Sequence, residues 1–549
     1  MTPEPVATGR LVANWERLSG LGLAELLADP DRGDQWRATA GPLTVDAARD
    51  LIDEGAFAAL AEHLRTVTPW LRRFLAGEAV NSDEQRAAAH WALRARPGRP
   101  AIVDRVDVSA QVAEALRRMT DVAAGIRSGR IRTPAGRAFT SVISVGIGGS
   151  DLGPAMAAAT LGMPGVGDGA EHLPVHFCAN VDPVAAAAAV RGCDPATTLI
   201  IVASKTFTTV ETMANAALLR TWLADAVGGD AAGHLVAVTA APARAADLGI
   251  AADRIFPFWD WVGGRFSLAS AISLPLMIGF GPPAVAQLRA GMCEVDEEVR
   301  ATLTGPLTPA ALHRSGAVLH GLLWYWYHAI GGLPAHAVIP YSEALARLPA
   351  YLQQLVMESN GKSTTLTGQP VATPTAPVVF GEPGTNAQHS FFQLLHQGTH
   401  IVPVDIIVAL SMTASPGFSG AAASHRLLLA NALAQAQVLA VGAAGAAGAA
   451  GERPEAAMPG GRPVTLITMD RLTPESLGAL IALYEHSTVI AAACLGINPF
   501  DQPGVEQGKR AAVHIDEALR TGEVAGLDPI SGHLVRRARE VAQASGSEG

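Results

Sequence analysis

Hydroxyl groups and one ammonium gather within a short stretch of the chain, Ser204-Lys205-Thr206-Phe-Thr208-Thr209. The stretch follows an apolar run, TLIIVASK, that predicts a strand, and it precedes a predicted helix. Hydroxyls, an ammonium and the unpaired N–H groups of a helix start all bind oxyanions, so this cluster suits a phosphate monoester. Helix capping by Ser or Thr is the alternative, but a cap needs only one hydroxyl, and we therefore favour phosphate.

A glycine-rich turn, Gly146-Ile-Gly-Gly-Ser150, follows a second predicted strand, SVISV. Glycines allow the backbone to approach a ligand closely, and a helix that starts there would offer N–H groups to an anion. The turn does not fit the GxGxxG dinucleotide pattern, because Asp151 stands in the place of the third glycine. An ordinary strand-to-helix turn remains the alternative interpretation.

Four side chains in other motifs could supply acid–base or electrostatic catalysis. Arg265 follows two glycines in GGRFS, and Glu358 lies in MESNGK at the end of a predicted helix, where a carboxylate can act as a general base. His389 ends the turn-rich run GEPGTNAQH, and Lys509 lies near the start of a predicted helix in FDQPGVEQGK. Taken singly, each has an ordinary structural alternative: a surface turn, a solvated glutamate, a structural histidine and an exposed lysine.

Metal, cofactor and nucleotide sites have no support in the sequence. Neither HExxH nor CxxC occurs, and Cys178, Cys193, Cys293 and Cys494 are scattered, which favours buried free thiols over a disulfide framework or a zinc ribbon. A Walker A loop is excluded because Val356 stands where its first glycine must be. We expect no metal and no cofactor.

Strands that alternate with helices must position these motifs. The runs SVISV, VHFCAN, TLIIVASK and HLVAVTA form a first set, with a helix predicted over 208–226. The runs HAVIPY, APVVF and IVPVDIIVAL form a second set after a helix predicted over 316–330. Alternation of this kind predicts an α/β fold with parallel sheets that helices cover on both faces.

The length of 549 residues indicates more than one domain. Residues 1–135 are predicted to be helical, since Ala38, Leu43, Ala47 and Leu51 recur at roughly helical spacing. We expect α/β domains over 136–290 and 291–528, and a frayed tail over 529–549. The Ala- and Gly-rich run that ends at Gly461 is predicted to be a flexible surface loop.

Composition restricts the class of protein. A hydrophobic share of 49% with 16% charged residues allows a large core, and a net charge of −10 argues against a nucleic-acid partner. The N-terminus does not resemble a signal peptide, and the apolar stretch 438–451 is too short and too rich in Ala and Gly for a membrane span. We expect a soluble, cytoplasmic protein with no membrane partner.

Taken together and in this order, the motifs resemble the signature blocks of the glucose-6-phosphate isomerase family. The blocks are VGIGGSDLGP, SKTFTTVETM, GGRFS, QQLVMESNGK, GEPGTNAQHSFFQLLHQGT and FDQPGVEQGK, and they extend from about Ser141 to about Leu519. The resemblance implies two sugar-isomerase (SIS)-type domains, an N-terminal helical region packed on the large domain, and a homodimer in which His389 crosses the interface. Departures such as Val356 and Ala387 fall at no position expected to be catalytic.

The resemblance also implies roles for individual residues. The expected substrate-binding residues are Gly149, Ser150, Ser204, Lys205, Thr206, Thr209 and Gln354. His389 and Lys509 would open the sugar ring, Glu358 would carry a proton between C2 and C1, and Arg265 would stabilise the enediol(ate).

The function implied is the reversible isomerisation of glucose 6-phosphate and fructose 6-phosphate, in glycolysis and gluconeogenesis. Two alternatives remain open at this point. One is a dual-specificity phosphoglucose/phosphomannose isomerase. The other is a non-catalytic sugar-phosphate-binding regulator, against which the presence of the four catalytic candidates argues.

Overall fold

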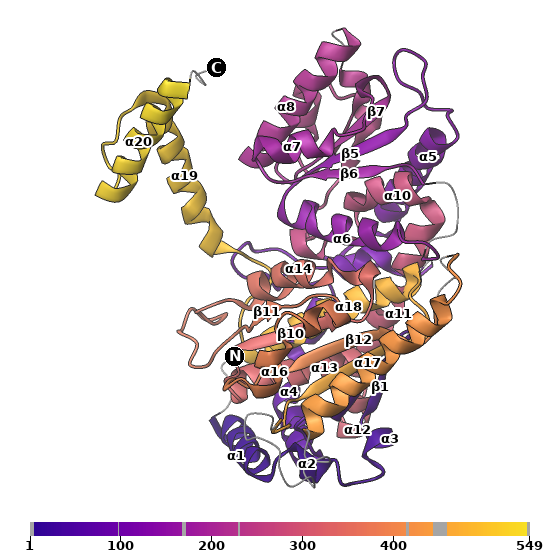
Figure 1. Ribbon diagram of the computed structural model, residues 1–549, viewed down its shortest axis with the longest axis vertical. Helices are drawn as coiled ribbons and strands as arrows, with labels where there is room; N and C mark the ends of the chain where they lie inside the picture. Colours follow the sequence, from indigo (N-terminus) through magenta and orange to yellow (C-terminus); the bar gives the residue numbers. More distant parts are fainter. Residues whose placement is uncertain are drawn as a thin grey trace. The chain divides into compact units, whose positions relative to one another are not determined.

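The computed structural model describes residues 5–96, 98–166, 172–228, 231–412, 417–442 and 458–545. The chain forms two compact units, Met1–Pro499 and Phe500–Gly549 (Figure 1). The first unit contains two main sheets with their helices, and the second contains two helices.

The first sheet has five parallel strands in the order β6-β5-β7-β8-β9. Their bounds are β5 (Ser141–Val145), β6 (Val175–Cys178), β7 (Thr198–Ala203), β8 (Leu235–Thr239) and β9 (Ile255–Pro257). The helices α7 (Pro183–Ala189), α8 (Val210–Val227) and α9 (Pro242–Asp247) share one hydrophobic core with β5, β7 and β8. The helices α6 (Leu152–Leu161) and α10 (Leu274–Phe280) contact each other, and α10 contacts β5 (Figure 1).

The order of this sheet marks the place where a ligand is expected. From β5 the chain continues to β6 on one side, and it returns to β7 on the other side. Ligands of parallel α/β sheets bind at the carboxyl ends of strands where the order reverses in this way. The glycine turn after β5 and the hydroxyl cluster after β7 both lie at that point.

The second sheet has six strands in the order β1-β2-β13-β12-β10-β11. The parallel strands are β10 (Ala335–Pro340), β11 (Val378–Phe380), β12 (Val404–Ala409) and β13 (Val464–Met469). One hydrophobic core joins strands β10, β12 and β13 to α15 (Gly384–Gln388), α16 (Phe392–Gln397) and α17 (Ala421–Val441). The α/β fold with parallel strands and covering helices is therefore confirmed.

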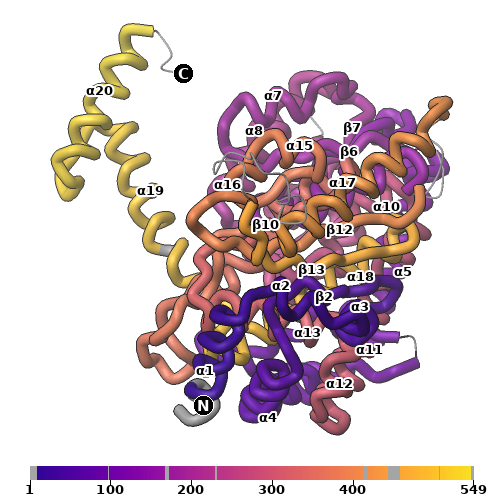
Figure 2. The backbone as a smooth tube through the Cα atoms, turned by 60° about the horizontal axis from the view of Figure 1, so that its bottom comes forward, coloured from indigo at the N-terminus to yellow at the C-terminus, as the bar shows by residue number. Residues whose placement is uncertain are grey.

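Part of the prediction for the N-terminal region is wrong. Most of the region is helical, in α1 (Pro5–Leu21), α4 (Glu54–Leu75) and α5 (Ser109–Arg127), but residues 37–49 form β1 (Arg37–Ala40) and β2 (Leu43–Arg49). Gly41, with φ +56°, turns the chain between them, and β2 pairs antiparallel with β13 (Figure 2). Pairing with a strand more than 400 residues away overrides the local spacing of apolar residues.

Every residue of the helix α18 (Pro474–Leu495) is buried except Glu475, which is half-buried. The helix packs on α11 (Pro282–Thr304) and α13 (Gly316–Tyr325). Among the described residues it is the one helix long and apolar enough to cross a membrane, and it lies wholly inside the protein.

The second unit consists of α19 (Pro503–Thr521) and α20 (Pro529–Ser545). The prediction of a frayed tail from 529 is wrong for residues 529–545. The carboxylate of Asp528 accepts hydrogen bonds from the N–H groups of Ile530 and Ser531, which satisfies the start of α20, and Val535 is buried. The Ala- and Gly-rich run before Gly461 lies mostly outside the described residues.

The remaining elements are short. They include α2 (Leu23–Leu26), α3 (Arg32–Gln35), α12 (Pro309–Arg314), α14 (Leu348–Leu352), β3 (Ile102–Val103), β4 (Val106–Asp107), and the single turns η1 (His90–Arg94), η2 (Gly148–Ser150) and η6 (Gly264–Phe266). Two segments have a π-helical pattern, Trp326–Ile330 and Gln353–Glu358. The domain boundaries near 135, 290 and 528 stay predictions.

The crossing of α11 and α18 depends on two glycines. A Cβ atom at Gly291 would lie 1.8 Å from the carbonyl oxygen of Glu475, and one at Gly478 would lie 1.8 Å from that of Leu288. We expect Gly291→Ala to destabilise the protein by about 2–3 kcal/mol, because backbone atoms must move apart. A Gly20→Ala control, at a helical site with nothing within 4 Å, should be neutral or stabilising. An unchanged thermal midpoint for Gly291→Ala would contradict the close approach.

Candidate active site

The turn after β5 brings the first sheet against the segment that carries Arg265. Gly148 has φ +59°, a conformation that favours glycine. A Cβ at Gly149 would lie 2.1 Å from the carbonyl carbon of Gly264, so the two backbones are in contact. A Cβ at Gly148 would lie 3.0 Å from Nε2 of Gln354. The glycines of this turn therefore allow the predicted residues Gly149, Arg265 and Gln354 to converge.

The hydroxyl cluster forms the loop between β7 and α8. The hydroxyls of Ser204 and Thr209 are 3.1 Å apart, and the Ser204 hydroxyl also accepts a hydrogen bond from the N–H of Phe207. Thr209 is the residue before α8, yet its side chain forms no capping hydrogen bond. Thr206 is exposed and Thr209 is half-buried. The expected capping bond is thus absent at Thr209, whereas Ser204 makes a local bond of that kind to Phe207, and the anion site stays a prediction.

Lys205 connects this loop to the segment before Arg265. Its ammonium donates hydrogen bonds to the carbonyl oxygens of Asp260, at 2.8 Å, and Val262, at 3.2 Å. Burial lowers the pKa of Lys205 to about 8, and the positive charge of Arg86 adds to this effect. A partly desolvated ammonium in the loop that also carries these hydroxyls is a suitable partner for a phosphate dianion.

Glu358 and Arg265 form an ion pair, with 3.2 Å between Oε2 and Nη1. The Arg265 side chain is 3% exposed and the Glu358 side chain 25% exposed. Arg265 also donates from Nε to the hydroxyl of Ser359, at 2.6 Å, and from Nη2 to the carbonyl oxygen of Pro499, at 2.6 Å. The guanidinium is thus held from three directions, while the carboxylate remains open to solvent on one side.

Gln354 holds the Glu358 carboxylate from the same helical segment. Its Nε2 donates to Oε2 of Glu358 at 3.0 Å. The two residues lie in the π-helical turn Gln353–Glu358, and such turns are frequent at functional sites. The Oε1 atom of Gln354 is buried and accepts no hydrogen bond from the described residues. The sugar contact expected of Gln354 stays a prediction.

His389 is not brought to this pair by any contact of the described residues. His389 follows α15, is exposed, and its imidazole forms no hydrogen bond or ion pair within the ranges described. Lys509 lies on α19 in the second unit, and the structure describes it within that unit alone. Their catalytic roles stay predictions. The neighbouring His396 is buried, and its Nε2 forms a hydrogen bond of 2.8 Å with Oε1 of Gln435, which fits a structural histidine.

Sequence reasoning missed the groups that orient Arg265. Ser359 directly follows Glu358 in MESNGK, so its position in that motif was an available signal. The carbonyl of Pro499 and those of Asp260 and Val262 are backbone groups, for which side-chain patterns carry no signal.

The thiol prediction is confirmed: all four cysteines are free, and Cys178, Cys293 and Cys494 are buried, while Cys193 is half-buried. In the part of the chain that the structure describes, no three His, Cys, Asp or Glu side chains gather as possible metal ligands.

The hydroxyl cluster Ser204–Thr209, called the oxyanion loop after the anion that it is predicted to bind, lies at the carboxyl end of a parallel sheet and is tied to the segment before Arg265. Together with the Glu358–Arg265 pair it fits an α/β protein for acid–base chemistry on a phosphorylated small molecule. The sequence matches the family described as phosphoglucose isomerase over residues 46–535, and the chain belongs to that family.

Relatives and a solved structure agree with this assignment. The chain is 44% identical over 529 residues to the glucose-6-phosphate isomerase of Xanthobacter autotrophicus, with 93% of each chain covered. It is 43% identical over 535 residues to that of Brucella anthropi, with 94% of each covered. The crystal structure of a glucose-6-phosphate isomerase from Chlamydia trachomatis superposes with a TM-score of 0.82 at 30% identity, covering 97% of this chain and 98% of the other.

The lowered pKa of Lys205 gives a test of the oxyanion loop. Between about pH 7.5 and 9.5 inorganic phosphate is mainly a dianion, while Lys205 loses its proton as the pH rises through about 8. We expect the dissociation constant for phosphate, measured calorimetrically, to rise several-fold across this range. Lys205→Arg stays protonated, so its dissociation constant should change little. The same rise in both proteins would show that Lys205 does not contact the anion.

Proposed function

We propose that the chain catalyses the reversible isomerisation of glucose 6-phosphate and fructose 6-phosphate through an enediol(ate). One observation carries the proposal: the half-open carboxylate of Glu358 is held by Gln354 and by the enclosed guanidinium of Arg265, whose segment is tied to the oxyanion loop. Relatives that are 43–44% identical over nearly their whole length carry the name glucose-6-phosphate isomerase, which supports the same reaction.

The geometry suits a proton transfer between adjacent carbons. With the phosphate on Ser204, Lys205 and Thr209, the open-chain sugar extends toward Glu358, which takes the proton from C2. The C2–H electrons form the C1=C2 double bond, and the carbonyl electrons move onto O1. Arg265, whose own side chain is largely shielded from water, stabilises that negative charge. Glu358 then returns the proton to C1, where the C1=C2 electrons form the new C–H bond. The proton of the C2 hydroxyl moves to O1, and the O2 electrons form the C2=O double bond of the ketose.

The orientation of the base and the anchoring of the phosphate have different energetic roles. Contacts to phosphate act on substrate and transition state alike, whereas the guanidinium acts on charge that exists only in the transition state. Gln354 keeps the carboxylate in one rotamer, so that little reorganisation is needed at the moment of transfer.

The proposal includes the cellular and quaternary setting. We place the enzyme in the cytoplasm, in glycolysis and gluconeogenesis, and we infer a homodimer in which His389 enters the site of the partner and assists ring opening with Lys509. The exposed and unpaired imidazole of His389 supports this part, because such a side chain can contact a second copy of the chain.

Loss of the proposed base should abolish turnover. We expect Glu358→Gln to lower kcat by at least about 10²–10⁴-fold while fructose 6-phosphate still binds. The measurement is a coupled assay that follows glucose 6-phosphate through a NADP-reducing dehydrogenase, with EDTA present. Glu382→Gln, which changes an exposed glutamate in a neighbouring motif, is the matched control and should keep normal turnover. Normal turnover by Glu358→Gln would refute the base.

Contribution of His389 across an interface can be tested by mixing two inactive variants. If each site combines Glu358 of one subunit with His389 of the other, a heterodimer of Glu358→Gln and His389→Ala contains one intact site. Half of the dimers are mixed after random exchange, so roughly a quarter of the normal activity should return. A mixture that stays as inactive as its components would show that both residues act within one chain.

A further inference from the structure

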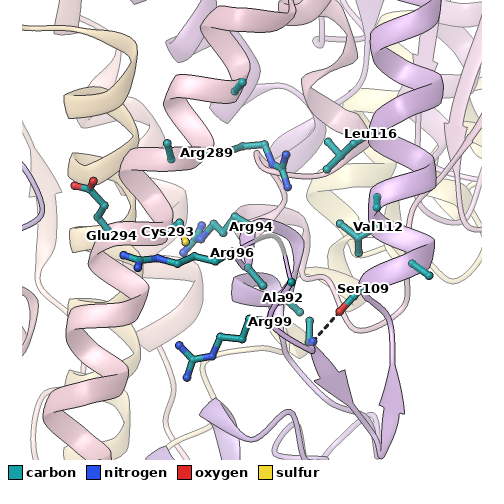
Figure 3. A pocket seen from close by; sticks show the side chains of 17 residues that line it. Ala92, Arg94, Arg96, Arg99, Ser109, Val112, Leu116, Arg289, Cys293 and Glu294 are labelled. Atoms are coloured by element: carbon teal, nitrogen blue, oxygen red, sulfur yellow. Dashed lines mark hydrogen bonds between the residues drawn. The ribbon is translucent and has the colours of Figure 1, made fainter.

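A cavity of about 780 Å³ lies away from the site described above, between α5, α11 and the segment 92–101 (Figure 3). None of its lining residues belongs to the oxyanion loop or to the glutamate–arginine pair. Small apolar side chains face each other across it and leave the space unfilled: Ala92, Ala101, Ala110, Ala113, Ala286 and Ala290. The volume lies within the range of small-molecule sites.

One guanidinium projects into this cavity without a counter-ion. Arg289 extends from α11 toward Leu116 of α5 (Figure 3). Its Nη2 donates to the carbonyl oxygen of Leu93, but its Nε is shielded from solvent and has no hydrogen-bond partner among the described residues. No described carboxylate forms an ion pair with it.

Two of the three other arginines that line the cavity are paired with carboxylates, and the side chain of the third, Arg96, lies beside Cys293 (Figure 3). Arg94 is paired at 2.6 Å with both Asp296 and Glu485, and Arg99 is paired with Glu297. Glu294 also lines the cavity, yet its side chain lies on the other side of α11 from the Arg289 guanidinium (Figure 3). The positive charge of Arg289 is therefore uncompensated within the cavity.

A bound anion would stabilise the uncompensated guanidinium of Arg289 in this cavity. Burial lowers the pKa of Arg289 to about 10, and the positive charge of Arg94 adds to this effect. Desolvation of a cation is costly unless an anion or hydrogen-bond acceptors replace the lost water. The planar guanidinium matches a carboxylate or a phosphate group, and the surrounding alanines offer contact to an apolar body.

We propose that this cavity is a second ligand site, in which Arg289 binds the carboxylate or phosphate group of an organic anion whose apolar part lies against the alanines of α5 and α11. The site is separate from the catalytic pair and would be occupied together with the substrate.

The test uses phenyl phosphate and phenylacetate as probes, titrated calorimetrically into the full-length protein saturated with fructose 6-phosphate, so that the catalytic oxyanion loop is already occupied. We expect one saturable site per chain with a dissociation constant of about 1 mM or lower for at least one probe. Arg289→Leu should weaken that binding by about tenfold or more, because it removes the charged partner of the bound anion. The stronger of the two probes identifies the anionic group.

Controls separate the site from general effects of charge and folding. Arg220→Leu removes an exposed arginine of α8 and should leave binding unchanged. Ala113→Leu fills the cavity from the exposed face of α5 without altering a charge, and it should weaken binding as well. Neither change should alter turnover of fructose 6-phosphate. Absence of saturable binding by both probes, or binding that persists in Ala113→Leu or in Arg289→Leu, would overturn the proposal.

Discussion

The arrangement of the candidate site depends on how Arg265 is enclosed. Its guanidinium meets the carboxylate of Glu358, the hydroxyl of Ser359 and the carbonyl oxygen of Pro499. These partners come from two regions of the chain, each more than 90 residues from Arg265. A guanidinium with so little exposure is tolerated only if its donors are satisfied, so folding must bring all three partners together before the site exists.

The close backbone approach of Gly149 and Gly264 adds a steric condition to this electrostatic one. Any side chain at Gly149 would collide with the segment that carries Arg265. Lys205 reinforces the same segment through the carbonyl oxygens of Asp260 and Val262. The oxyanion loop and the charged pair are thereby joined into one rigid arrangement, which is the condition for transition-state stabilisation by fixed groups.

Buried polar groups also hold the second sheet together. Asp405 of β12 lies between His320, at 3.0 Å, and His336, also at 3.0 Å. Burial alone raises the pKa of Asp405, but these two histidines lower it well below its usual range. A carboxylate held in this way ties β12 to α13 and stabilises the sheet whose helices carry Glu358.

The sequence by itself determined the alternation of strands and helices, the short motifs in the loops between them, and the residue types that chemistry requires. These features are local: a loop after a buried strand and before a helix can be recognised from a few neighbouring residues, as with Ser204–Thr209.

Only the tertiary structure decided that residues 37–49 join the second sheet, that residues 529–545 form a helix, and that Ser359 and Pro499 orient Arg265. It also decided that alanines of α5 and α11 face each other around Arg289. The physical reason is that the energy of a hydrogen bond or a packing contact depends on distance in space and not on separation along the chain. Contacts between residues hundreds of positions apart therefore produce no periodic pattern in the sequence.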